Sequence, residues 1–177
     1  MKLFKKYPLI ITVSFLLLSC GFQPSSVSSN DENISSEITP IDNTSLAQNL
    51  PIGAKLIIDD QEIELEIAET PQQQSIGLMY RDVIPPNRGM LFPFNPPQTV
   101  SFWMKNVSIP LDMIFISENV VKHITTAPPC KVEPCQLYNS NVPIDQVIEL
   151  ASGRANELNI KVGDRIKLEI LESKKNN

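Results

Sequence analysis

The chain is poor in basic residues. Fifteen Lys and Arg face twenty Asp and Glu, and three of the basic residues, Lys2, Lys5 and Lys6, lie close to the first position. Without these three, twelve basic and twenty acidic residues remain, which gives a net charge of −8. Such an acidic surface repels nucleic acids and anionic lipid surfaces. A nucleic-acid-binding role is therefore excluded.

Signatures of common enzymes are missing as well. The sequence has one histidine, His123, and it has no GxSxG or HExxH motif and no carboxylate pair at a telling spacing. A single strand histidine is more commonly solvated or hydrogen-bonded than a general base. We therefore expect no catalytic residue. A hydrolase that uses Asp112 with Lys105 or Glu69 for acid–base chemistry is kept as an alternative.

The apolar run at residues 9–18 is too short to span a bilayer, which takes about 20 apolar residues. It follows the basic stretch at Lys2, Lys5 and Lys6, which is the layout of a secretory signal. The run ends in LLSCG, residues 17–21, which resembles the lipobox of bacterial lipoproteins. We expect a signal peptide over residues 1–19 and lipid attachment at Cys20. An ordinary secretory cleavage and an uncleaved anchor are the alternatives.

Lipidation would anchor the chain to a membrane. Acyl chains such as palmitate contribute about 0.8 kcal/mol per buried methylene. Gly21 after the cysteine, in place of Asp, resembles the pattern sorted to the outer membrane, facing the periplasm, in cells with two membranes. Residues 20–50 are rich in Ser, Asn, Asp, Glu and Thr and show no hydrophobic period, so we expect a disordered tether. We also expect a disordered tail at residues 173–177.

Three cysteines suit an exported lipoprotein. If Cys20 carries lipid, Cys130 and Cys135 remain as a pair in the Pro-rich segment PPCKVEPCQLY. In an oxidising compartment a disulfide is the favoured state of such a pair. A redox-active or metal-binding thiol pair is the alternative, but four residues separate the two cysteines and a single histidine accompanies them.

Residues 51–172 show short apolar and polar alternations broken by turn residues. We expect hairpins around residues 59–61 and 117–119, and further strands at residues 89–92, 100–104, 147–150 and 165–171. Thr70, Pro71 and Gln73 predict the start of a short helix, and a second short helix is expected near residues 155–158. Seven or eight short strands with one or two short helices predict a mainly β, β-rich α+β domain. Its architecture is expected to be a compact antiparallel sandwich or partly open barrel.

Six strings of this sequence resemble, in order, those of the domain of unknown function 192 (DUF192) family. The resemblance implies a compact, mainly antiparallel β domain with a short helix or two, and it implies no activity. The strings are GLMYRD at 77–82, GMLFPF at 89–94, SFWMKN at 101–106, IPLDMIFI at 109–116, IELASG at 148–153 and VGD at 162–164.

The strongest candidate site is a set of five polar or amphipathic residues among apolar strands: Arg81, Trp103, Lys105, Asn106 and Asp112. In the structural interpretation, Asp112 pairs with Arg81 or Lys105, and Asn106 satisfies the backbone near Pro110. In the functional interpretation, Arg81 and Lys105 meet a polar or anionic small-molecule ligand and Trp103 offers a stacking face. Strand alternation predicts that Phe102 and Met104 face away from Trp103 and Lys105.

Methionines offer one further chemistry, because thioethers can hold copper(I). Three of the four methionines between positions 79 and 113, however, lie in apolar strings typical of a core. We therefore expect no metal and no cofactor, and the residues identify no protein partner. The sequence favours a membrane-anchored binding module or envelope component, with a purely structural or protein-interaction domain as the alternative. The four methionines are Met79, Met90, Met104 and Met113.

Overall fold

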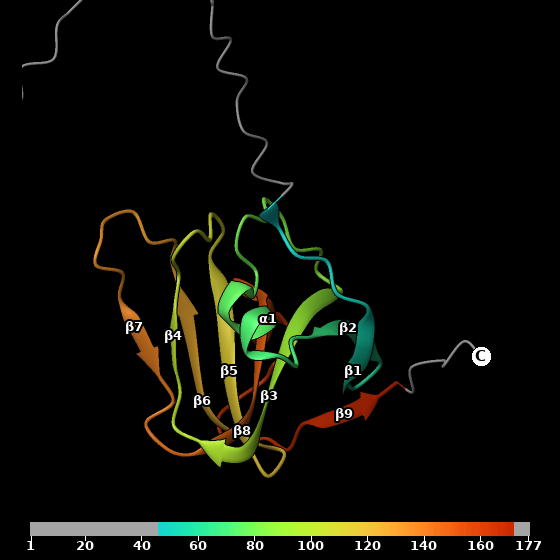
Figure 1. The fold of residues 1–177 in the computed structure, drawn as a ribbon. Helices are drawn as coiled ribbons and strands as arrows, with labels where there is room; N and C mark the ends of the chain where they lie inside the picture. The colour runs from blue at the N-terminus through green and yellow to red at the C-terminus, as the bar shows by residue number, and fades with distance from the viewer. Residues whose placement is uncertain (1–45, 172–177) are drawn as a thin grey trace, which may run out of the picture. The chain divides into compact units, whose positions relative to one another are not determined.

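The computed structural model describes residues 46–171, which form a mainly β domain with two short helices (Figure 1). The expected signal peptide, Cys20, most of the tether and the tail at 173–177 lie outside the described residues. No helix within residues 46–171 is long and apolar enough to cross a membrane.

Seven strands form one mixed sheet in the order β6-β5-β8-β3-β2-β1-β9, and β4 pairs with β7 in a separate two-stranded sheet. The strands are β1 (Ile52–Ile58), β2 (Gln61–Ile67), β3 (Arg88–Gln98), β4 (Ser101–Trp103), β5 (Leu111–Ser117), β6 (Val120–Ala127), β7 (Leu137–Asn139), β8 (Ile144–Ala151) and β9 (Lys167–Ile170). The helices are α1 (Pro71–Ile76) and α2 (Arg154–Glu157).

Local sequence signals set several of these elements. Both expected hairpins form: β1 pairs with β2 and β5 pairs with β6, each antiparallel. Helix α1 begins with the predicted capping box, in which the Thr70 hydroxyl accepts from the Gln73 amide and the Gln73 side chain accepts from the Thr70 amide. These groups satisfy backbone donors that the first helical turn leaves free.

Pairing between distant segments departs from the expected antiparallel pattern. Strands β2 and β3 are parallel, with α1 in the connection between them. Strand β6 and the segment just before β9 meet at one isolated bridge, Val120 with Arg165, but β6 and β9 themselves do not pair, so the sheet does not close into a barrel. The mainly β class with short helices is confirmed, and the architecture is a curved, open, mixed sheet.

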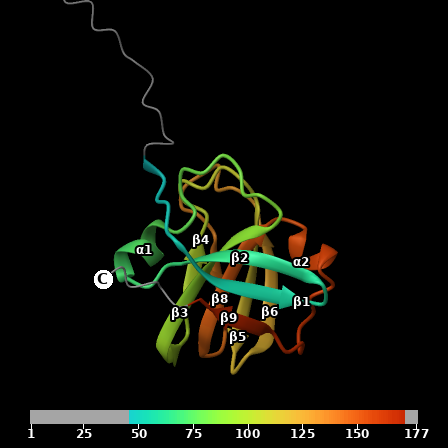
Figure 2. The same cartoon turned by 90° about the vertical axis from the view of Figure 1, so that its right-hand side faces the viewer.

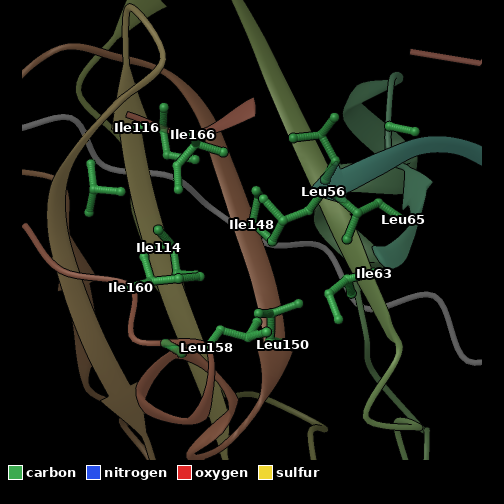
Figure 3. Close-up of a cluster of buried hydrophobic side chains, with 14 residues drawn as sticks. Leu56, Ile63, Leu65, Ile114, Ile116, Ile148, Leu150, Leu158, Ile160 and Ile166 are labelled. Carbon is green, nitrogen blue, oxygen red and sulfur yellow. The ribbon is translucent and has the colours of Figure 1, made fainter. Parts of the chain in front are cut away.

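The sheet separates two apolar clusters. One includes Leu56, Leu65, Ile114 and Ile148 and is covered by α2 and the segment after it; Figure 3 shows its side chains pointing toward one another from β1, β2, β5 and β8. The second cluster lies on the other face, against α1, the turn after it and the β4–β7 sheet, and it contains Met90, Phe92, Met113 and Phe115 among others. The two helices accordingly lie well apart in the domain (Figure 2).

Candidate functional site

Two segments, the turn at residues 77–82 and residues 101–108, which comprise β4 and the loop after it, meet beside the second cluster. The Tyr80 amide donates to the Asn106 carbonyl at 2.8 Å, and the Asn106 side-chain amide donates to the Tyr80 hydroxyl at 2.8 Å. The Ser108 hydroxyl donates to the Arg81 carbonyl at 3.0 Å. Tyr80 and Asn106 both have left-handed backbones, with φ of 64° and 57°. Such strain on a bulky residue is held only by surrounding contacts and is commonest at functional sites.

A small cavity of about 30 Å³, here called the inner cavity, lies between these segments and the sheet. Gly77 ends α1 with φ 49° and ψ −127°, a conformation that glycine adopts with little strain, and so directs the chain along the cavity wall. The volume suffices for one or two water-sized groups. The cavity is lined by Gln74, Ser75, Ile76, Gly77, Leu78, Met79, Phe92, Phe102, Trp103, Val107 and Glu149.

Glu149 is the one titratable residue that lines the inner cavity. It lies on β8 opposite Met90 of β3 and Met113 of β5, and its side chain is 4% exposed. Burial raises its pKa from 4.5 to about 8, and no charged neighbour contributes to the shift. No hydrogen bond or ion pair within residues 46–171 engages its carboxyl group. It is therefore a buried, protonated carboxyl group that faces a cavity at neutral pH.

A second, larger pocket of about 310 Å³, here called the outer pocket, adjoins the inner cavity at Val107. Its polar groups come from the Tyr80–Asn106 pair and from Asp82 and Ser108, and Cys130 closes one side. The Cys130–Cys135 disulfide is formed, with the two Cα atoms 5.5 Å apart, as the sequence predicted.

Arg81 does not face either pocket as a free cation. Its two terminal nitrogens donate to the two carboxylate oxygens of Glu66 at 2.7 Å each, and one of them also donates to the Gln48 carbonyl. The expected pairing of Asp112 with Arg81 or Lys105 is wrong. Lys105 lies 3.4 Å from Glu133, in the loop closed by the disulfide, and its ammonium is 5.5 Å from the centre of the Trp103 ring.

Asp112 has a structural position on the opposite face of the sheet. One carboxylate oxygen accepts from the Thr126 hydroxyl at 2.7 Å, and the other accepts from the Ala155 amide at 2.9 Å, which caps α2. Asn106 also differs from the expectation, because its side chain contacts the Tyr80 hydroxyl and does not satisfy the backbone near Pro110.

The alternation predicted along β4 is confirmed. Met104 is buried and Phe102 packs against the second cluster, whereas Trp103 is 45% exposed at the rim of the inner cavity. Of the five predicted site residues, Trp103 and Asn106 therefore line the pockets, Lys105 lies beside Trp103, and Arg81 and Asp112 are engaged elsewhere.

Glu149 is not among the site residues predicted from the sequence. A signal for it exists: Val147, Glu149 and Ala151 alternate on one face of a buried strand, so a carboxylate in the middle position must enter the core.

The methionines considered for copper lie in the same region, with Met90, Met104 and Met113 fully buried and Met79 packed against them. No group of three or more His, Cys, Asp or Glu among residues 46–171 is placed to hold a metal ion.

Residues 54–168 match the DUF192 family, described as an uncharacterized ACR, and the chain belongs to this family. No curated protein matches the chain.

Two solved structures are similar to the chain. One, from Sinorhizobium meliloti 1021, is provisionally described as a transcription regulator; it is 35% identical, with a TM-score of 0.58 over 64% of this chain and 90% of that one. The other, from Novosphingobium aromaticivorans, is described as a protein of unknown function; it is 28% identical, with a TM-score of 0.59 over 73% of this chain and 98% of that one.

The strings that carry the family resemblance converge on the two pockets. GLMYRD and SFWMKN supply the facing walls, GMLFPF supplies Phe92 and IELASG supplies Glu149. Four segments that are distant along the chain therefore meet at one place, which identifies it as the candidate functional site of the domain.

Proposed function

We propose that this protein is a membrane-anchored, extracytoplasmic binding module that holds a small polar ligand in the two adjoining pockets without catalysing a reaction. The buried Glu149 carboxyl group carries the proposal. Burial raises the pKa of this carboxyl group, no hydrogen bond within residues 46–171 engages it, and Glu149 lines the inner cavity, so a polar ligand that enters the cavity can bond to it. Trp103 at the rim adds an aromatic face for the part of the ligand outside the cavity.

The polarity of the pockets favours a neutral or cationic ligand over an anionic one. Both cations that could have met an anion, Arg81 and Lys105, already contact the carboxylates of Glu66 and Glu133. Asp82 adds a further carboxylate to the outer pocket. The acidic chain, with a net charge of −5, gives no support for carrying over the transcription-regulator description of the Sinorhizobium structure.

The absence of catalysis is part of the proposal, with hydrolysis as the alternative. Acid–base catalysis needs a second group within reach of the reacting atoms, such as a nucleophile or a base. Among residues 46–171, Glu149 has no titratable companion in the inner cavity. Of the candidate acid–base residues, Asp112 is bound to Thr126 and Ala155.

Anchoring rests on the sequence of residues 1–21. The expected lipid on Cys20 would hold the domain at the periplasmic side of an outer membrane, or outside a cell with a single membrane. The Cys130–Cys135 disulfide supports an oxidising compartment. Replacing Cys20 with Ala should release the protein from the membrane fraction; a Cys20→Ala variant that still sediments with membranes would contradict lipid anchoring.

Ligand binding is tested on the full chain, purified in mild detergent from an exporting host without refolding. Native mass spectrometry should show a reproducible extra mass, absent from Glu149→Gln and retained in the control Glu69→Gln, whose carboxyl group is exposed. The chain has one tryptophan, so Trp103 fluorescence reports on the site directly. A bare mass, together with no saturable fluorescence response to n-butylammonium, butyramide or butyrate, would overturn the binding function.

A further inference from the structure

We propose that the inner cavity selects ligands that carry a primary ammonium group, which enters the cavity and pairs with an ionised Glu149. The inference rests on the proposed binding function and names its ligand class. Three independent features of the pockets lead to it: the size of the inner cavity, the charge of the residues that line both pockets, and the aromatic residues that line the inner cavity up to its rim.

The size of the inner cavity suits a compact head group. A cavity of about 30 Å³ holds one or two groups the size of a water molecule. A primary ammonium is close to a water molecule in size and can donate three hydrogen bonds. The planar guanidinium is larger than this space, so an ammonium is favoured over a guanidinium. The rest of such a ligand would pass Val107 and lie in the outer pocket, which measures about 310 Å³.

The lining of the pockets carries negative charge and no cation. Around Glu149, helix α1 contributes Gln74 and Ser75, and strands β3 and β4 contribute aromatic rings; none of these residues titrates. The outer pocket contributes the exposed carboxylate of Asp82. A cationic head group would therefore supply the counter-charge that an ionised Glu149 does not find in the protein. A carboxylate or phosphate would meet no unpaired cation there.

The Trp103 ring already accepts a cation from the protein itself. The Lys105 ammonium lies 5.5 Å from the ring centre, which is within the range of a cation–π contact. The same indole lines the inner cavity, next to Phe102 and Phe92. A ligand ammonium that passes this rim is thus stabilised by aromatic faces before it reaches the carboxyl group.

Binding of an ammonium must release the proton of Glu149. At neutral pH the carboxyl group is protonated, because burial raises its pKa to about 8. The bound ammonium favours the carboxylate, so the proton passes to solvent and the ion pair remains in the cavity. The apparent affinity for the ammonium ligand therefore rises with pH, because the fraction of Glu149 that is ionised and able to pair with it grows. It falls again when the ligand amine loses its own proton, near pH 10.4 for an alkylamine of the lysine type.

Titrations of Trp103 fluorescence on the full chain test this inference with three probes of similar size. n-Butylammonium should bind saturably, and its affinity should be about 100-fold higher at pH 9 than at pH 6, since only about 1% of Glu149 is ionised at pH 6. Glu149→Gln should remove both the pH dependence and most of the affinity, whereas Glu69→Gln should behave as the unaltered chain. Butyramide and butyrate should bind more weakly at every pH.

The possible failures can be told apart. If butyramide binds as tightly as n-butylammonium and pH has no effect, the ammonium inference is overturned while the binding function stands. If no probe binds and no mass co-purifies, the binding function itself fails. Far-UV circular dichroism of Glu149→Gln is the control for folding: a spectrum like that of the unaltered chain assigns a loss of binding to the site.

Discussion

Arg81 and Glu66 form a two-point ion pair that fixes the loop after α1 to strand β2. Both terminal guanidinium nitrogens lie 2.7 Å from the carboxylate oxygens, and the two side chains are only 15% and 12% exposed. The second Glu66 oxygen also accepts from the Leu50 amide. The arginine that the sequence suggested as a ligand contact is thus part of the scaffold that positions Tyr80.

Arg81→Ala should strongly destabilise the domain. The substitution leaves the Glu66 carboxylate largely buried without its counter-charge, and breaking a buried pair in this way costs about 3–5 kcal/mol. Arg88→Ala is the matched control, because its pair with Glu64 is longer, 3.3 Å, and its side chains are 42% and 39% exposed. That exposed pair contributes at most about 1 kcal/mol. Urea unfolding measures both; a loss of at most about 1 kcal/mol for Arg81→Ala would show that its pair with Glu66 contributes no more than an exposed pair.

Glu149 should make the stability of the protein fall as pH rises from about 4.5 to 8. In the unfolded chain its carboxyl group ionises near its ordinary pKa of 4.5, whereas burial holds the folded-state pKa at about 8. Between these values the folded state binds more protons than the unfolded state. The free energy of unfolding therefore decreases with pH, by up to about 1.4 kcal/mol per unit. Below pH 4.5 and above pH 8 this contribution is constant.

The Glu149→Gln variant isolates this effect, because glutamine has a similar shape and no proton to lose. Relative to the unaltered chain, it should gain stability between pH 5 and pH 8 and be the more stable protein at pH 8. Thermal unfolding at several pH values gives the difference. Parallel stability curves for the two proteins would show that Glu149 is ionised in the folded state at neutral pH.

Local signals made much of the fold predictable. The β1–β2 and β5–β6 hairpins and the capping box of α1 each depend on a few neighbouring residues, and all of them form. Strand β7 (Leu137–Asn139) and the parallel pairing of β2 with β3 are not predicted by such local signals. A three-residue strand carries little pattern, and the direction of pairing across a long connection is set by packing of the whole sheet.

The site was predictable only in part, and for a related reason. Trp103 and Asn106 stand out in the sequence because they are unusual residues in an apolar context, and both line the pockets. Which carboxylate meets which cation depends on segments that approach each other only in the folded protein. Arg81 therefore meets Glu66, and Glu149 is left without a partner, although both carboxylates are visible in the sequence.

Asp112→Ala should destabilise the domain without altering the two pockets. Asp112 is 2% exposed, and its two oxygens accept from the Thr126 hydroxyl and the Ala155 amide. The change removes a hydrogen bond to a charged acceptor and the cap of α2, together about 3 kcal/mol. Thr126→Val keeps the cap and loses the one bond to the charged acceptor, so it should cost about 2 kcal/mol. A change in probe binding to Trp103 in a folded Asp112→Ala protein would place Asp112 in the site after all.

Opening the Cys130–Cys135 disulfide should lower stability modestly and also weaken ligand binding. Closing so short a loop contributes about 2 kcal/mol in the chain-entropy model. The same loop carries Glu133, which contacts Lys105, while Cys130 lines the outer pocket. A Cys130→Ser, Cys135→Ser double variant should therefore unfold at lower urea and bind n-butylammonium less tightly. The intact protein should be lighter by two hydrogens than its reduced form. A double variant that loses stability but keeps full affinity would show that the disulfide supports the fold and not the outer pocket.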